Sequence, residues 1–280
     1  MDFMTPVDFQ DVAAPEKFAQ SLVDTGFGVL TNHGIAHALI DQVYDEWRSF
    51  FASAEKAKYT YTTEEQAGYF PFRSENAKGS AYGDLKEFYH YYPWWDHNPI
   101  AQMQATLRYY DQITEMAFTL LEWVEAQTPA PIRNGLTSGF AAMAKDSPKT
   151  FLRILHYPPL SGAEKDGEIR AAAHEDINLL TLLPAATHPG LQVRNRQGHW
   201  FDVPCDPGNI VVNIADMLQE ASAGYYPSTT HRVLKPTGEQ AKQSRYSLPL
   251  FLHAKPEVQL SERYTAKAYL NERLREIGLM

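Results

Sequence analysis

The sequence contains one cysteine, no long apolar run and no cluster of basic residues. Cys205 alone cannot form an internal disulfide, which excludes a disulfide-stabilised scaffold and fits a reducing compartment such as the cytoplasm. No stretch approaches the ~20 unbroken apolar residues of a bilayer-spanning helix, and the acidic start MDFMTPVDFQDV lacks the pattern of a signal peptide. We therefore expect a cytoplasmic protein without a membrane partner.

The net charge of −9 and the lack of a Lys/Arg cluster argue against nucleic acid as a partner. The 280 residues, 44% of them hydrophobic, suit one large domain or two closely packed ones. The oligomeric state cannot be deduced from the sequence.

The first half of the chain is predicted to be largely helical. Pro15 near its start and Gly26 at its end mark the segment APEKFAQSLVDTG as a capped helix, followed by a short strand, FGVLTN. Apolar periodicity predicts a further helix over 36–53 and a long one over about 100–127, and residues 66–86 are expected to be irregular. A last helix is expected over about 261–277.

After residue 148 the pattern changes to short β-rich runs separated by turn residues. The runs are FLRILHY, INLLTLL, GLQVRN, HWFDV, NIVVNI, THRVLK and RYSLPLFLH. This rhythm predicts an antiparallel sandwich or barrel. The expected fold is thus a mainly β core with flanking helices and a helical N-terminal half.

The stretch HEDINLLTLL places His174 and Asp176 one residue apart, just before an apolar run. On a strand, both side chains would point to the same side. The pair alone is equally compatible with two polar residues at the start of an ordinary strand.

A second histidine, His231, follows 57 residues later in STTHRV. Two histidines and one carboxylate on neighbouring strands can occupy one face of an octahedral metal, as in non-haem Fe(II) oxygenases. The absence of thiolate ligands argues against a structural zinc site. By itself, His231 could equally be a buried histidine with hydrogen-bond partners.

Arg245 and Ser247 in RYSLPLF lie two apart on a predicted strand and so share a face. A guanidinium beside a hydroxyl is a good receptor for a carboxylate. Because the flanking residues are apolar, the strand is expected to be buried, and a buried arginine requires an anion. Tyr157 in RILHYPP could place a phenol near the same cavity, or simply end a strand.

Together these pieces resemble the iron- and 2-oxoglutarate-dependent dioxygenases. His174-x-Asp176, the distant His231 and Arg245-x-Ser247 occur in the order and approximate spacing of that family. The closer resemblance is to its isopenicillin N synthase-like branch. The segment GLQVRNRQGHWFDVPCDPGNIVVNIADMLQEAS is similar to the core of that branch, and VDFQDV, DTGFGVLTNHGI and GSAYGDLKEFYHY to its earlier regions.

The resemblance implies a double-stranded β-helix, or jelly roll. It implies a non-haem dioxygenase N-terminal region over 5–125, an Fe(II)/2-oxoglutarate dioxygenase core over 149–254 and a C-terminal helical segment, packed on the core, over 255–280. The expected reaction uses O2 to oxidise a C–H bond of a small molecule and releases succinate and CO2. Hydroxylation, desaturation and ring closure are all open outcomes.

The resemblance also implies roles for the site residues. His174, Asp176 and His231 would form the catalytic centre by binding Fe(II). Arg245 and Ser247 would bind the distal carboxylate of 2-oxoglutarate, and Tyr157 would assist at the other end of that cosubstrate. One departure is Leu155, where many plant relatives have an asparagine that makes a polar contact.

The substrate is expected to contact the aromatic-rich segment 68–95. We predict that Phe72, His90 and Phe251 line the pocket, although packing of the N-terminal half would also explain these aromatic residues. The identity of the substrate is not encoded in this pattern. Alternative functions are an oxidase of the same branch that uses no 2-oxoglutarate, a non-catalytic binding protein on the same scaffold and, from the ligands alone, a zinc hydrolase.

Overall fold

A computed structural model describes residues 4–75 and 82–276. Its strands are β1 (Val7–Asp8), β2 (Phe27–Thr31), β3 (Gly68–Phe70), β4 (Glu87–Tyr91), β5 (Phe151–Tyr157), β6 (Ala171–His174), β7 (Leu180–Pro184), β8 (Leu191–Arg194), β9 (Trp200–Asp202), β10 (Ile210–Ile214), β11 (His231–Val233), β12 (Arg245–Ser247) and β13 (Leu250–Leu252). Its helices are α1 (Ala14–Thr25), α2 (His37–Ala52), α3 (Gln104–Gln127), α4 (Ala130–Arg133), α5 (Phe140–Ala144), α6 (Asp216–Ala221) and α7 (Ala266–Glu276), with 3-10 turns η1 (Ala54–Tyr59), η2 (Ile100–Gln102) and η3 (Gly238–Lys242).

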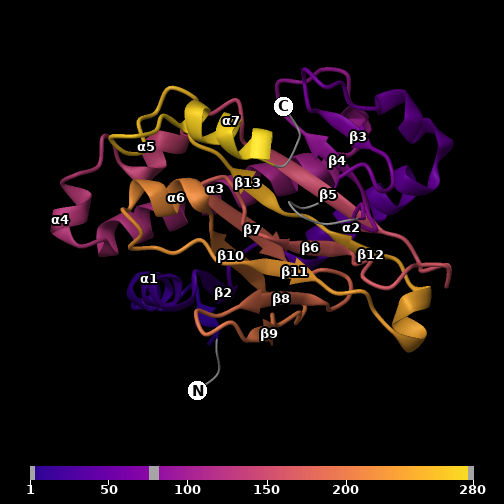
Figure 1. The fold of residues 1–280 in the computed structure, drawn as a ribbon, viewed down its shortest axis with the longest axis horizontal. Coiled ribbons are helices and arrows are strands. Elements are labelled where there is room, and N and C mark those ends of the chain that lie inside the picture. Colours follow the sequence, from indigo (N-terminus) through magenta and orange to yellow (C-terminus); the bar gives the residue numbers. More distant parts are fainter. Residues whose placement is uncertain (1–3, 76–81, 277–280) are drawn as a thin grey trace.

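Two sheets form the core (Figure 1). The larger has the strand order β1-β2-β10-β7-β13-β5-β4-β3, with β12 also paired to β5, and the smaller has the order β6-β11-β8-β9. Among these paired strands of the described residues, only β1 and β2 run parallel. The antiparallel core with flanking helices is the predicted jelly roll.

The central strands are apolar on both faces because both faces are covered. In β10, with the sequence IVVNI, Val212 packs in the large core cluster that includes the helices. Its neighbour Val211 points the other way and packs with Val193 of β8 in a second cluster between the two sheets. A strand buried on both sides reads as a continuous apolar run rather than an alternating one.

Helix α3 packs against α1, α2 and the strands β7 and β13. Its N-cap residue makes no side-chain hydrogen bond, so a neighbouring helix supplies the missing acceptor. The Glu46 carboxylate of α2 accepts from the backbone N–H of Ala105 at 3.0 Å and of Thr106 at 2.9 Å. The Trp47 indole, also on α2, donates to the Thr106 hydroxyl at 2.9 Å. These bonds fix how α2 and α3 pack on the sheet.

The predicted helix cap at Gly26 is confirmed. Gly26 has φ = +73° and donates its N–H to the carbonyl of Leu22, which ends α1 and turns the chain into β2. Positive φ is the conformation that favours glycine at a helix C-terminus. No described helix combines the length and the apolar character needed to cross a bilayer.

The predicted strands after residue 148 are present, and FLRILHY is β5 from end to end. The short strand predicted at FGVLTN is β2, which joins one side of the larger sheet together with β1. The first half differs from the prediction because it also contributes β3 and β4 to the other side of that sheet. Strand β3 falls within the segment expected to be irregular. The last helix begins at Ala266 rather than near 261, because the Thr265 hydroxyl accepts from the Ala268 N–H and caps it there.

Candidate active site

Two neighbouring strands and one loop bring the predicted metal ligands together. His174 ends β6 and His231 begins β11, and the two are register partners across that strand pair. Asp176 is not on the strand: β6 stops at His174, and Asp176 lies in the connection to β7. Its backbone carbonyl accepts from the Asp216 N–H at 2.8 Å, which anchors the loop beside α6.

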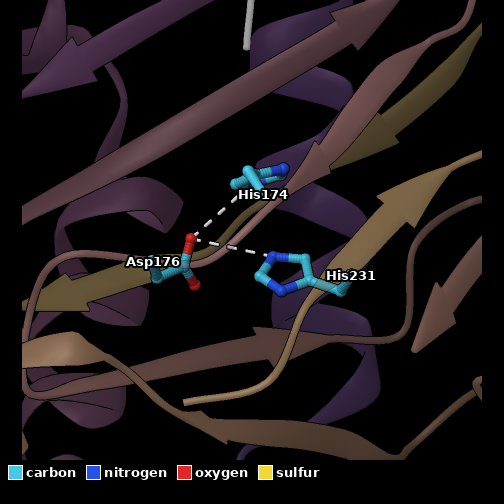
Figure 2. A group of neighbouring side chains, drawn as sticks. All are labelled: His174, Asp176 and His231. Carbon is cyan, nitrogen blue, oxygen red and sulfur yellow. Dashed lines mark ion pairs between the residues drawn. The ribbon is translucent and has the colours of Figure 1, made fainter. Parts of the chain in front are cut away.

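The three side chains converge on one point (Figure 2). Asp176 Oδ1 lies 3.7 Å from Nε2 of His174 and 3.7 Å from Nε2 of His231. One ligand atom from each of the three residues lies within 4.8 Å of the other two. A metal binds imidazole nitrogen or carboxylate oxygen at ~2.1 Å, so two ligand atoms on one ion are at most ~4.2 Å apart. The 3.7 Å separations therefore suit a shared ion.

Hydrogen bonds on the far side of each ligand set its orientation. Nδ1 of His174 donates to the carbonyl of Ala172 at 2.8 Å, and Nδ1 of His231 donates to the carbonyl of Thr229 at 3.1 Å. These carbonyl partners assign the proton to Nδ1 and leave the Nε2 lone pair facing Asp176.

The carboxylate of Asp176 is held in the same way. Its Oδ2 accepts from the Thr181 hydroxyl at 2.8 Å and from the Asn213 amide at 2.9 Å, which leaves Oδ1 facing the imidazoles. Burial raises the pKa of the Asp176 carboxyl, but His231, His174 and these two hydrogen bonds together bring it below its ordinary value. Burial, reinforced by His231, lowers the pKa of His174. A carboxylate and a neutral imidazole are the forms that bind metals.

A second group of residues meets where β12 pairs with β5. Arg245 lies opposite Tyr157, and Ser247 opposite Leu155. Arg245, Ser247 and Tyr157 are all at least 97% buried, and the Arg245 guanidinium carbon lies 5.1 Å from the centroid of the Tyr157 ring. The family resemblance predicts Tyr157 at the end of the cosubstrate opposite to Arg245, whereas the register places it beside Arg245.

The guanidinium of Arg245 is only partly satisfied by the protein. Its Nε donates to the carbonyl of His188 at 2.9 Å, whereas its Nη1 has no hydrogen-bond partner in the described part of the chain. Within the described residues, Arg245 forms no ion pair with a carboxylate. Because a buried charge without a counter-ion is costly, this geometry suits an anionic ligand.

A cavity of about 740 Å³ opens beside His174 and Asp176. Part of its wall is an ionic network in which Lys86 lies 2.8 Å from both Glu75 and Asp84, and Arg153 lies 3.3 Å from Glu75. Phe70, Phe88, Phe151 and Phe251 also line the cavity, together with further charged residues such as Lys149 and Arg273. A cavity with aromatic walls and convergent polar groups is the usual kind of small-molecule site.

Of the three residues predicted to contact substrate, two line this cavity and one does not. Phe251 and His90 line the cavity. His90 accepts from Arg153 Nε at 2.8 Å and donates from Nδ1 to the carbonyl of Gln66 at 2.9 Å, so it also orients Arg153. Phe72 is 44% exposed and is not among the lining residues.

Sequence reasoning missed Arg153, Glu75 and His253 in this wall. Arg153 did carry a signal, because a charged residue in the middle of the apolar run FLRILHY needs a partner. His253 follows Phe251 by two residues, the spacing that puts two side chains on one face of a strand. Glu75 carried no local signal.

Comparison with known proteins is consistent with this geometry. The model of the 2OG-Fe(II) oxygenase superfamily matches residues 148–254, and that of the non-haem dioxygenase N-terminal region, described from morphine synthesis, matches residues 6–114. A crystal structure from Caulobacter crescentus, assigned to the 2OG-Fe(II) oxygenase family, is 31% identical, with 98% of this chain and 99% of that chain covered and a TM-score of 0.81. The chain belongs to the 2OG-Fe(II) oxygenase superfamily.

Two further relatives of this oxygenase support the assignment. A crystal structure of a Shewanella oneidensis protein, assigned as an oxygenase, is 48% identical, with 99% of both chains covered and a TM-score of 0.88. A 2-oxoglutarate-dependent dioxygenase of Didymella fabae is 28% identical over 274 residues, which cover 88% of this chain and 80% of that protein.

As a member of this superfamily, the oxygenase uses Fe(II) and 2-oxoglutarate. The side chains of this site fit both Fe(II) and 2-oxoglutarate. The nitrogen and oxygen ligands of the His-Asp-His cluster suit Fe(II), and the free Nη1 of Arg245 suits a carboxylate.

Proposed function

We propose that the protein oxidises a C–H bond of a small molecule in the cavity beside His174 and Asp176, and that 2-oxoglutarate is converted to succinate and CO2. The observation that carries the proposal is the pairing of two sites within one jelly roll. One is a His-Asp-His cluster whose ligand atoms face one another, and the other is a buried Arg245 that pairs with no carboxylate of the described residues.

The individual roles follow from the hydrogen bonds. His174 and His231 would bind Fe(II) through Nε2, and Asp176 would bind it through Oδ1. Three protein ligands would leave the ion able to bind the cosubstrate and O2 as well. Arg245 and Ser247 bind the distal carboxylate of 2-oxoglutarate, with the Tyr157 phenol beside them. Bound iron, together with 2-oxoglutarate and O2, supplies the oxidising chemistry.

The protein's own part is to position the substrate and to keep water out. Phe251 stacks on Phe151 with ring centroids 5.0 Å apart, which makes a flat apolar wall. His90 holds the Arg153 guanidinium in place at the cavity surface. We propose Phe251 and His90 as substrate-side residues; Phe72 stays a prediction that its exposed position does not favour.

We also propose that the protein belongs to the isopenicillin N synthase-like branch. The order of His174-x-Asp176, His231 and Arg245-x-Ser247, and the match of its N-terminal region over residues 6–114, support this placement. The segments 5–125, 149–254 and 255–280 are proposed as its functional divisions. The single Cys205 supports a reducing compartment, for which we propose the cytoplasm.

The proposal is tested by titrating the protein with Fe(II) and then 2-oxoglutarate without oxygen, and by following the visible charge-transfer absorption of the chelate. We expect the absorption in the wild type and in Arg48→Gln, which alters an exposed arginine paired with Asp45. We expect it to be lost in Arg245→Gln with iron still bound. Iron binding without the absorption would favour the oxidase that uses no 2-oxoglutarate. Failure to bind iron would refute the site.

A further inference from the structure

A second buried arginine lies at the same tyrosine as Arg245. Arg170 directly precedes β6 and is 2% exposed. Its guanidinium carbon lies 5.7 Å from the centroid of the Tyr157 ring, and that of Arg245 lies 5.1 Å from the same centroid. Two cations from different segments of the chain therefore approach one tyrosine ring in the interior of the jelly roll.

Neither arginine has a counter-ion among residues 4–75 and 82–276. Nη2 of Arg170 donates to the carbonyl of Gln243 at 3.1 Å, but its Nε has no hydrogen-bond partner, just as Nη1 of Arg245 has none. Carbonyl oxygens satisfy N–H groups without neutralising charge. Burial, followed by the charge of Arg245, lowers the pKa of Arg170 to about 10. Two buried like charges near each other are costly unless an anion accompanies them.

The acidic residues that could neutralise Arg170 have other partners. Glu168, two residues away, pairs with Arg73 at 3.0 Å and accepts from the N–H of Lys165 at 2.8 Å. Asp84 pairs with Lys86 at 2.8 Å. Within the described residues, Arg170 forms no ion pair, so its charge is available to an anionic ligand.

We propose that Arg170 is a second guanidinium of the receptor for the distal carboxylate of 2-oxoglutarate, so that Arg170 and Arg245 bind the same carboxylate beside Tyr157. The inference rests on the proposed role of Arg245. Two guanidinium groups offer fork-shaped donor pairs and positive charge, which is the chemistry that binds a carboxylate in a buried site. The consequence is strong selection for 2-oxo acids with a second carboxylate at the far end.

The test compares two ligands that differ only in that carboxylate. Binding of 2-oxoglutarate and of 2-oxopentanoate, which has the same carbon chain without the distal carboxylate, is measured without oxygen on the iron-loaded protein. The variants are Arg170→Gln, Arg170→Lys, Arg245→Gln and the exposed control Arg48→Gln. Iron stoichiometry and circular dichroism show whether each variant is folded with its metal site intact.

We expect Arg170→Gln to weaken 2-oxoglutarate binding about 10- to 100-fold, the usual effect of losing a charged hydrogen bond, and to change 2-oxopentanoate binding less than about threefold. Arg170→Lys keeps the charge and should recover part of the loss. If Arg170→Gln fails to fold, the test rests on Arg170→Lys. An affinity of that variant for 2-oxoglutarate equal to the affinity of the wild type would overturn the inference.

Equal weakening of both ligands would show that Arg170 only supports the structure around Tyr157, and would overturn the inference. Dependence of 2-oxoglutarate binding on Arg245 but not on Arg170 would also overturn it, and would leave the proposed function intact. If the wild type binds iron but not 2-oxoglutarate, the proposed function fails and this inference fails with it.

Discussion

The Thr181 hydroxyl donates to Oδ2 of Asp176 at 2.8 Å, and so decides which carboxylate oxygen faces the two imidazoles. Thr181 is 3% exposed and lies on β7, in the larger sheet, whereas the imidazoles come from the smaller sheet. The hydrogen bond thus ties the proposed metal centre to the opposite sheet of the jelly roll.

Replacing this hydroxyl should loosen the metal centre without removing a ligand. We expect Thr181→Val, which has nearly the same shape, to weaken Fe(II) binding about 10- to 100-fold, the usual cost of losing an outer partner of a metal ligand. The measurement is competition for Fe(II) against a chelator of known affinity. Thr106→Val is the matched control, because its buried hydroxyl bonds Trp47 and Glu46 far from the metal ligands. Equal affinities in wild type and Thr181→Val would contradict the role of Thr181.

Removing the charge of the ligand itself should have a larger effect. Asp176→Asn keeps the size of the side chain but replaces the anionic oxygen with a neutral amide, so we expect iron affinity to fall by more than the ~100-fold associated with outer partners. Iron content after gel filtration measures this loss, and circular dichroism reports on the fold. Retention of one iron per chain would show that Asp176 is not a ligand.

A glycine remote in sequence should also affect the metal centre. A Cβ at Gly26 would overlap Oγ1 of Thr229 and the carbonyl of Pro227, and the carbonyl of Thr229 is the group that orients His231. We expect Gly26→Ala to cost about 1–2 kcal/mol of stability from its positive φ and a further ~1–3 kcal/mol from the overlap. Denaturant unfolding measures the stability, and chelator competition measures the iron affinity, which should also fall.

Gly224→Ala is the matched control for that experiment. Gly224 has φ = +79°, close to that of Gly26, but a Cβ there would meet nothing within 4 Å. We expect it to show the cost of positive φ alone, with iron affinity unchanged. Similar losses in both variants would mean that the contact with Thr229 is unimportant.

Acid should destabilise the protein through His253. Burial, reinforced by Lys149 and Arg153 and opposed by Asp176, lowers the pKa of His253 to about 3. Between pH 6.5 and 3 the unfolded chain therefore holds a proton on this residue that the folded chain does not. Stability is lost as the pH falls through this window, by up to about 1.4 kcal/mol per pH unit for one proton.

The measurement is urea unfolding of iron-free wild type and His253→Asn from pH 8 to pH 4.5. The wild type should lose stability more steeply than the variant below pH 6.5, and the two curves should run parallel above pH 7.5. Parallel curves over the whole range would show that His253 is protonated in the folded protein.

The sequence predicts features that depend on neighbours in the chain. The apolar run FLRILHY predicts β5, and Gly26 predicts the end of α1, because strand pairing and helix termination use local chemistry. Arg245 and Ser247 share a strand, so their common face also follows from spacing. The spacing of His174 and Asp176 predicts a shared strand face, whereas a loop and not a strand brings Asp176 beside the imidazoles.

The remaining features depend on contacts between distant segments. Tyr157 lies beside Arg245 because of the register between β5 and β12, which no local pattern specifies. Strand β4 is buried along its whole length although it contains Glu87 and His90, whose polar groups are satisfied by His156 and by Arg153. Such strands lack the alternation of polar and apolar residues that would reveal them.

The strand order of the larger sheet has a consequence for how the protein is made. The ribosome produces β1 to β4 first, and in the finished sheet these strands lie outside β10, β7, β13 and β5, all of which come later. The first half alone therefore contains the outer strands of the larger sheet and none of the central strands that lie between them. Folding must wait for distant partners, which is slow and leaves unpaired strand edges exposed. We expect a nascent chain stopped before residue 149 to be sensitive to protease and dependent on chaperones.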